Sequence, residues 1–148
     1  MLAKQKIIKI FILNLLFWVP TLMVLFLYLQ SDYQIIKKID QIENVPLFQI
    51  IWRNLIVVLT LILSGIIHKM IPYFIFGLNA FYFSIMLLMS DNVIINLFQV
   101  SKYGIIEVFA LSIACFIGVY KDYFLTWLPV ILILTAALIE HKVIIREL

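Results

Sequence analysis

Residues 103–120 read YGIIEVFALSIACFIGVY, an apolar run long enough to cross a lipid bilayer as a single helix. A spanning helix needs about 20 mainly apolar residues, and about 17 suffice. On a helix, the small residues Ala110, Ala114 and Gly118 fall on one face, which lets a neighbouring helix approach closely. Glu107 falls on the same face, so we expect its carboxyl group to point into a helical bundle and not toward lipid.

The composition of the whole chain supports the same environment. Of its 148 residues, 66% are hydrophobic and 13% are charged, whereas a soluble domain is about half apolar and about a quarter charged. The chain is therefore predicted to be an all-α integral membrane helical bundle that forms one domain over residues 1–148. Its net charge of +3 comes from Lys and Arg residues scattered at helix ends. Because they form no basic stripe, nucleic acid is not expected as a partner.

Four further runs resemble the first in length and composition. Together they predict five spans, at residues 7–29, 50–67, 73–89, 103–120 and 123–139. His68-Lys69 and Lys121-Asp122 separate consecutive spans, because charged groups belong at the membrane surface. The runs 73–89 and 123–139 are short for a bilayer, so four or six spans remain alternatives.

Residues 32–45 have a different pattern. Charged and amide residues occupy most of the helical surface, while one face is formed by four isoleucines, Ile35, Ile36, Ile39 and Ile42. This pattern predicts a short amphipathic helix, which ends at Pro46. Such a helix lies in the membrane interface with its apolar face toward the acyl chains.

The N-terminal segment indicates the topology. Lys4, Lys6 and Lys9 precede the apolar run 10–29 of the first span, and a basic cluster at this position favours the cytoplasmic side. The run 7–29 is of membrane length and no small-x-small cleavage site follows it, so we expect a retained span and not a cleaved signal peptide. The Ile-, Phe- and Lys-rich composition is typical of an AT-rich Gram-positive bacterium. The predicted location is thus the bacterial cytoplasmic membrane, with the N-terminus inside.

Polar residues within the spans need partners, because an unpaired polar group in lipid is costly. Asn54 and Glu107 each lie near the first edge of their spans, and these two spans run parallel. We therefore predict a hydrogen bond between the two side chains, across a contact of spans 50–67 and 103–120. Gly65 shares a face with Asn54, which also favours close packing there.

Two further polar positions are informative. Asn79 lies among aromatic residues of the span 73–89, and Ser64 is its predicted partner. For Glu107 two roles are open, a structural carboxyl group and a site for a proton or an ion. Its shallow depth and the lack of a basic partner within the spans favour the structural role.

The sequence contains no pattern for catalysis or cofactor binding. It lacks the His-Glu-x-x-His pair of zinc enzymes, the Gly-x-Ser-x-Gly elbow of hydrolases and a phosphate-binding loop. Ser64 and His68 lie one helical turn apart, but a hydrolytic dyad also requires an oxyanion hole and access for water. The single cysteine, Cys115, cannot form an intrachain disulfide or a cysteine-based metal cluster. We therefore expect no enzymatic activity, and no metal or cofactor.

Two motifs in these spans resemble those of a known family. One places an Asn near the start of a helix and Ser-Gly near its end, and the other begins a helix with x-Gly-x-x-Glu and continues with small residues. They occupy Asn54, Ser64, Gly65, Tyr103, Gly104, Glu107, Ala110, Ala114 and Gly118. In this order and spacing they resemble the stage II sporulation protein M family, over roughly residues 47–120.

The chain departs from the family pattern at three places. The family has His where this chain has Tyr103, Asn-Gly where it has Asn79-Ala80, and Gly where it has Ser84. The chain therefore resembles a divergent member, and a role for the family's His does not transfer.

The resemblance implies a non-catalytic membrane scaffold that acts in a multiprotein complex with cell-wall hydrolases during engulfment. An alternative is an accessory protein of an ABC-type transporter or of a bacteriocin export or immunity system. A third is a small channel or a proton-coupled carrier. The expected partners are the lipid bilayer and either the hydrolase complex or a transporter ATPase and permease, with self-association left open. The residues of both motifs, together with Asn79, are the expected interaction residues.

Overall fold

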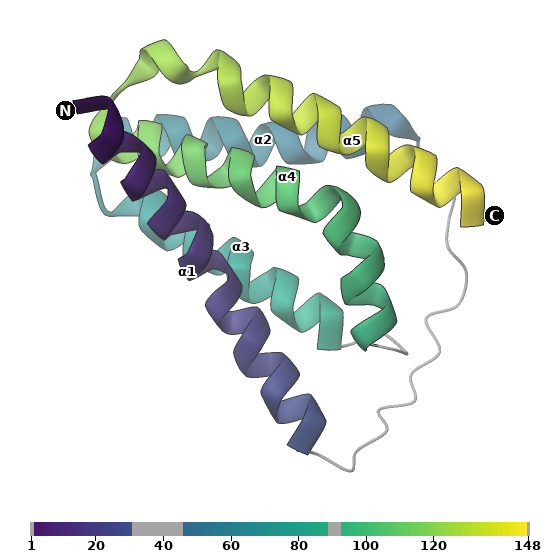
Figure 1. Ribbon diagram of the computed structural model, residues 1–148. Coiled ribbons are helices and arrows are strands. Elements are labelled where there is room, and N and C mark those ends of the chain that lie inside the picture. The colour runs from purple at the N-terminus through teal and green to yellow at the C-terminus, as the bar shows by residue number, and fades with distance from the viewer. Residues whose placement is uncertain (1, 31–45, 89–92, 148) are drawn as a thin grey trace.

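The computed structural model is all-helical over the residues that it describes, which are 2–30, 46–88 and 93–147 (Figure 1). The elements in chain order are α1 (Leu2–Gln30), α2 (Leu47–Ile67), α3 (Ile71–Leu88), α4 (Val93–Tyr120), the short 3-10 helix η1 (Tyr123–Leu125) and α5 (Trp127–Glu147). The amphipathic helix predicted at residues 32–45 lies outside the described residues.

The prediction of an all-α fold with five membrane spans is confirmed. The stretches long and apolar enough to cross a membrane are Lys4–Leu29, Leu47–Ile67, Ile71–Leu88, Ser101–Tyr120 and Tyr123–Val143. They agree with the predicted spans to within a few residues. The largest difference is in the fifth, which continues past residue 139 and so includes Glu140.

The two short breaks at one end of the bundle have local causes. After α2, His68 is extended (φ −157°, ψ 136°), and its N–H donates to the Ser64 carbonyl at 3.2 Å. After α4, Lys121 adopts a left-handed conformation (φ 57°) and its N–H donates to the Ile117 carbonyl at 2.7 Å. This hydrogen bond is the usual way in which a left-handed residue closes a helix C-terminus.

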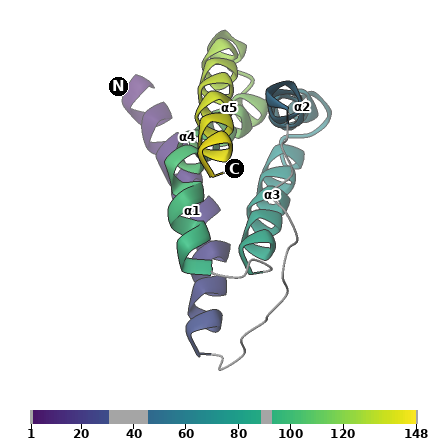
Figure 2. The ribbon, with the colours of Figure 1, turned by 90° about the vertical axis from the view of Figure 1, so that its right-hand side faces the viewer.

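Helix α4 is the centre of the bundle. It contacts α1, α2, α3 and α5, whereas α1 touches neither α2 nor α5 within the described ranges. Figures 1 and 2 show that the helices converge at the end where α1 begins, and fan apart toward the other end. As a result all residues of α4 from 110 to 118 are buried.

The core around α4 is apolar and aromatic. Phe17 of α1 is 2% exposed, and its ring centroid lies 5.3 Å from that of Phe76 and 6.0 Å from that of Phe83, both in α3. The Phe17–Phe76 pair is edge-to-face, and ring contacts of this kind favour a fixed position of α1 against α3. Val58 of α2 and Ile133 of α5 belong to the same core and are fully buried.

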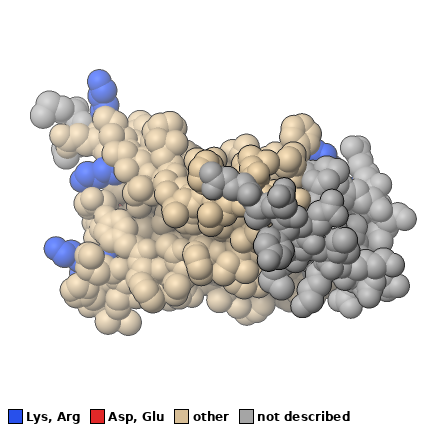
Figure 3. All heavy atoms as spheres, turned by 90° about the horizontal axis from the view of Figure 1, so that it is seen from below, with Lys and Arg blue, Asp and Glu red and all other residues tan. Residues whose placement is uncertain are grey.

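The outer surface is apolar as well, which is the arrangement expected in lipid. On the face seen in Figure 3, Lys and Arg atoms lie at the end where α1 begins and at one point toward the other end, and the described surface between them is uncharged. Large side chains such as Phe11, Leu22, Phe81 and Phe124 are more than half exposed. These residues would face the acyl chains.

Candidate functional site at the seam of α2 and α4

The seam between the parallel helices α2 and α4 contains most of the residues singled out from the sequence. Near its end, a Cβ atom on Gly65 would overlap the backbone carbonyl of Gly118, and a Cβ on Gly118 would overlap the carbonyl of Leu61. The two backbones are thus in direct contact. Only glycine at both positions permits this approach.

The small residues that precede Gly118 on α4 are also inside the bundle. Ala110 and Ala114 are 0% exposed and Gly104 is buried, while Tyr103 is half-buried. The carbonyl of Leu61 and the ring of Pro72 close the seam around Gly118, since a Cβ there would lie 3.0 Å from the Pro72 Cγ. The seam is therefore a tight structural joint and not an open groove.

At the other end of the seam, the predicted hydrogen bond between Asn54 and Glu107 is absent, so this prediction was wrong. Asn54 is 4% exposed and its Nδ2 has no hydrogen-bond partner among the described residues. The carboxyl group of Glu107 instead interacts electrostatically with Arg53 and with Glu140 of α5. Helical periodicity places Asn54 and Glu107 at a similar level of two parallel helices, but it does not bring the two side chains within hydrogen-bond distance.

These charged groups form a polar cluster, which we define as Arg53, Glu107 and Glu140. Arg53 Nη2 lies 3.8 Å from Glu140 Oε1, and the two side chains are 68% and 12% exposed. The cluster therefore brings one guanidinium and two carboxyl groups together from three helices, with an ion pair between Arg53 and Glu140. The Nδ1 of His141 is buried and has no hydrogen-bond partner within the described ranges.

The sequence reading missed both Glu140 and the role of Arg53. The predicted fifth span, 123–139, ends one residue before Glu140, and the sequence pattern does not single out Arg53. A signal for Glu140 was present, because Ile133, Ala136 and Ala137 are buried and the next positions of that helical face include residue 140. No three His, Cys, Asp or Glu side chains of the described chain are grouped so that they could bind a metal.

The predicted pairing of Asn79 with Ser64 was also wrong. Asn79 Nδ2 donates to the Ile75 carbonyl at 2.8 Å, and Ser64 Oγ donates to the Leu61 carbonyl at 3.1 Å. Each side chain is satisfied by a carbonyl of its own helix, which is always within reach, so neither requires a partner on another helix.

A polar contact that the sequence did not suggest joins α1 and α3. Thr21 Oγ1 and Ser84 Oγ lie 3.1 Å apart, and both side chains are buried. Ser84 donates its proton to the Ala80 carbonyl at 2.7 Å. Since a hydroxyl has one proton, Thr21 is the donor to Ser84.

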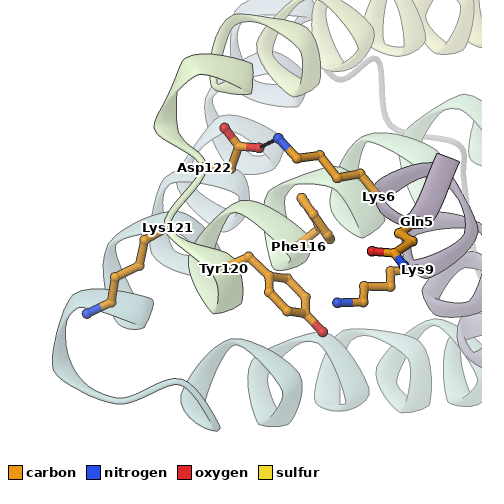
Figure 4. Close-up of a pocket in the computed structure, with 7 residues that line it drawn as sticks. All are labelled: Gln5, Lys6, Lys9, Phe116, Tyr120, Lys121 and Asp122. Carbon is orange, nitrogen blue, oxygen red and sulfur yellow. Dashed lines mark hydrogen bonds and ion pairs between the residues drawn. The ribbon is translucent and has the colours of Figure 1, made fainter. Parts of the chain in front are cut away.

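A cavity of about 410 Å³ lies at the opposite end of the bundle, where α1 begins and α4 ends. It is lined by Gln5, Lys6, Lys9, Phe116, Tyr120, Lys121 and Asp122 (Figure 4). Lys6 forms an ion pair with Asp122, and Lys9 Nζ lies 4.1 Å from the centroid of the Tyr120 ring. The cavity is thus basic and lies among the charged ends of the spans.

No protein family, curated protein or solved structure matches the chain. The resemblance to the stage II sporulation protein M family stays a prediction from the sequence motifs of α2 and α4.

Proposed function

We propose that this protein is a non-catalytic scaffold of the bacterial cytoplasmic membrane, divergent from but related to the stage II sporulation protein M family, and that it holds partner proteins in a complex. The observation that supports this proposal is the position of the family-like motifs. They lie on the one helix pair α2–α4, where Gly65 and Gly118 join the backbones and Glu107 sits in the polar cluster. Motif residues used for a helix joint favour an architectural role over catalysis.

Arg53 is the group of the polar cluster that a partner protein can reach. Its side chain is 68% exposed, and its contact with Glu140 is long at 3.8 Å. A guanidinium has five N–H donors in a planar fork, so most of its donors remain for a carboxylate of another protein. Arg53 is therefore the proposed contact for a partner at this surface of the membrane.

The test is affinity purification of the tagged full-length protein from native membranes after crosslinking. Wild type is compared with Arg53→Gln and with the matched control Lys142→Gln, which removes an exposed charge from the same end of the bundle. The proposal expects specific partners with wild type and the control, and their loss with Arg53→Gln. Identical recovery from all three, or no partner above background, would reject it.

The partners recovered also decide between the two kinds of complex. Cell-wall hydrolases would support the engulfment-type role. A transporter ATPase and permease would instead support the alternative of an accessory protein in transport, or in bacteriocin export and immunity.

A second candidate is a small proton or ion carrier, and the polar cluster favours it. Glu107 and Glu140 come from two different spans, and ionisable groups inside a membrane often mark a proton or ion path. Proteoliposomes containing a pH-sensitive dye test this candidate. A proton flux that Glu107→Gln abolishes would support it, and a flux equal to that of empty liposomes would reject it.

A further inference from the structure

The basic cavity at the converging end of the bundle has no role in the scaffold proposal. Its lining residues flank the ends of three spans: Lys4–Leu29 begins here, Ser101–Tyr120 ends here and Tyr123–Val143 begins here. A cavity at this level is at the depth of the lipid headgroups, where the phosphates of the bilayer lie.

The charges in the cavity suit an anion. Lys6 and Lys9 extend from α1 toward the end of α4, on either side of Phe116 and Tyr120, while the Lys121 ammonium points away (Figure 4). Asp122 balances Lys6 through their ion pair. Lys9 has no carboxylate partner within the described ranges, and its ammonium rests over the Tyr120 ring. The cavity therefore has a net positive charge.

The shape of the surroundings suits a lipid. The volume of about 410 Å³ is in the range of small-ligand sites. Ile12 and Leu16 follow Gln5 and Lys9 on the same face of α1 and are 49% and 56% exposed. An acyl chain attached to a headgroup in the cavity would run along these side chains into the hydrocarbon region.

We propose that this cavity binds the phosphate group of an acidic phospholipid. Lys6 and Lys9 contact the phosphate oxygens, and Gln5 and Asp122 lie where a polar headgroup hydroxyl can hydrogen-bond. An ammonium group binds phosphate as a point charge, and basic pockets between membrane helices are known lipid sites. A zwitterionic headgroup is bound less well, because its own cation meets Lys9.

The experiment uses native mass spectrometry of the full-length protein in detergent, with phosphatidylglycerol and phosphatidylcholine added in equal amounts. We expect a preference for phosphatidylglycerol that falls about tenfold or more when Lys6 and Lys9 are both changed to Gln, since each loses a charge-assisted contact. Lys9→Arg retains the charge and keeps the preference. Lys4→Gln and Lys69→Gln are exposed controls that do not line the cavity, and they keep it as well.

Three results would overturn the proposal. One is an equal occupancy of both lipids on wild type. Another is an equal loss of preference in the Lys4→Gln or Lys69→Gln control, which would assign the effect to general surface charge. The third is a response to free phosphate only. Inorganic phosphate would then raise the melting temperature of wild type but not of the double variant, and phosphatidylglycerol would have no effect. The ligand of the cavity would in that case be free phosphate and not a phospholipid. The lipid ratio does not depend on stability, so loss of the Lys6–Asp122 ion pair does not obscure the result.

Discussion

The backbone of Gly65 in α2 lies directly against the backbone carbonyl of Gly118 in α4, closer than any side chain would permit. Without a hydrophobic force between helices in lipid, such close packing is what holds two spans together. At the other end of the same two parallel helices, Arg53 of α2 lies within electrostatic range of Glu107 of α4.

Substitution at this contact should destabilise the bundle. Gly65→Ala and Gly118→Leu force the two backbones apart, and overpacking of this kind costs about 1–3 kcal/mol or more. Thermal or denaturant unfolding in detergent micelles measures the effect. Gly77→Ala is the matched control, because a Cβ at Gly77 would meet no atom within 4 Å. The control should unfold at or above the wild-type temperature, because Ala is the better helix former by about 1 kcal/mol.

The polar cluster should show coupling between Arg53 and Glu140. Arg53→Gln removes the guanidinium that lies 3.8 Å from the Glu140 carboxyl group, and we expect a loss of about 1 kcal/mol, limited by the exposure of the Arg side chain. Adding Glu140→Gln should recover part of that loss. A double-mutant cycle from unfolding free energies checks this, and strictly additive effects would contradict the pairing.

The contact between Thr21 and Ser84 should stabilise the packing of α1 on α3. Hydrogen bonds between membrane helices contribute about 0.6 kcal/mol on average and up to about 1.7, so we expect Thr21→Val to cost an amount in this range. Thr60→Val serves as the control, since Thr60 is exposed and bonds only to the Ile56 carbonyl of its own helix. Equal effects of the two changes on unfolding would argue against the contact.

The five spans place the two ends of the chain on opposite sides of the membrane. Cys115 is 0% exposed, so it should react slowly with a membrane-impermeant maleimide and leave a low background. Lys69→Cys and Lys121→Cys should then be labelled from one side, and Lys102→Cys and Lys142→Cys from the other. Labelling of residues 102 and 121 from the same side would mean that α4 does not cross.

The spans themselves were predictable from the sequence because lipid imposes one simple requirement. A chain crossing a bilayer must satisfy its backbone hydrogen bonds within a helix, and apolar runs of membrane length therefore mark the spans directly. Counting the spans also indicates which helices run parallel, and so places Asn54 and Glu107 near the same level. The fifth apolar stretch, Tyr123–Val143, continues past the predicted end at residue 139 and includes Glu140, which pairs with Arg53.

The partners of polar residues were not predictable in the same way. Helical periodicity gives the face on which a residue lies, but not which helix covers that face. Thr21 pairs with Ser84, and Arg53 with Glu140, across helices distant in the chain. Backbone carbonyls of the same helix also compete with side chains on other helices as hydrogen-bond partners, and Asn79 and Ser64 both donate to such carbonyls. The basic cavity depends on where α1 begins relative to the end of α4, which only the folded arrangement specifies.

The central position of α4 bears on how the protein is made. Helices leave the ribosome in chain order, so α1, α2 and α3 enter the membrane before the one helix that contacts all of the others. Before α4 is inserted, α1, α2 and α3 can form only the contacts of α3 with α1 and with α2. Gly65 then has no Gly118 against which to pack. A nascent chain that stops after α3 would lack the Gly65–Gly118 contact between α2 and α4. Assembly should therefore be late and abrupt, with the arrival of α4 as its deciding step.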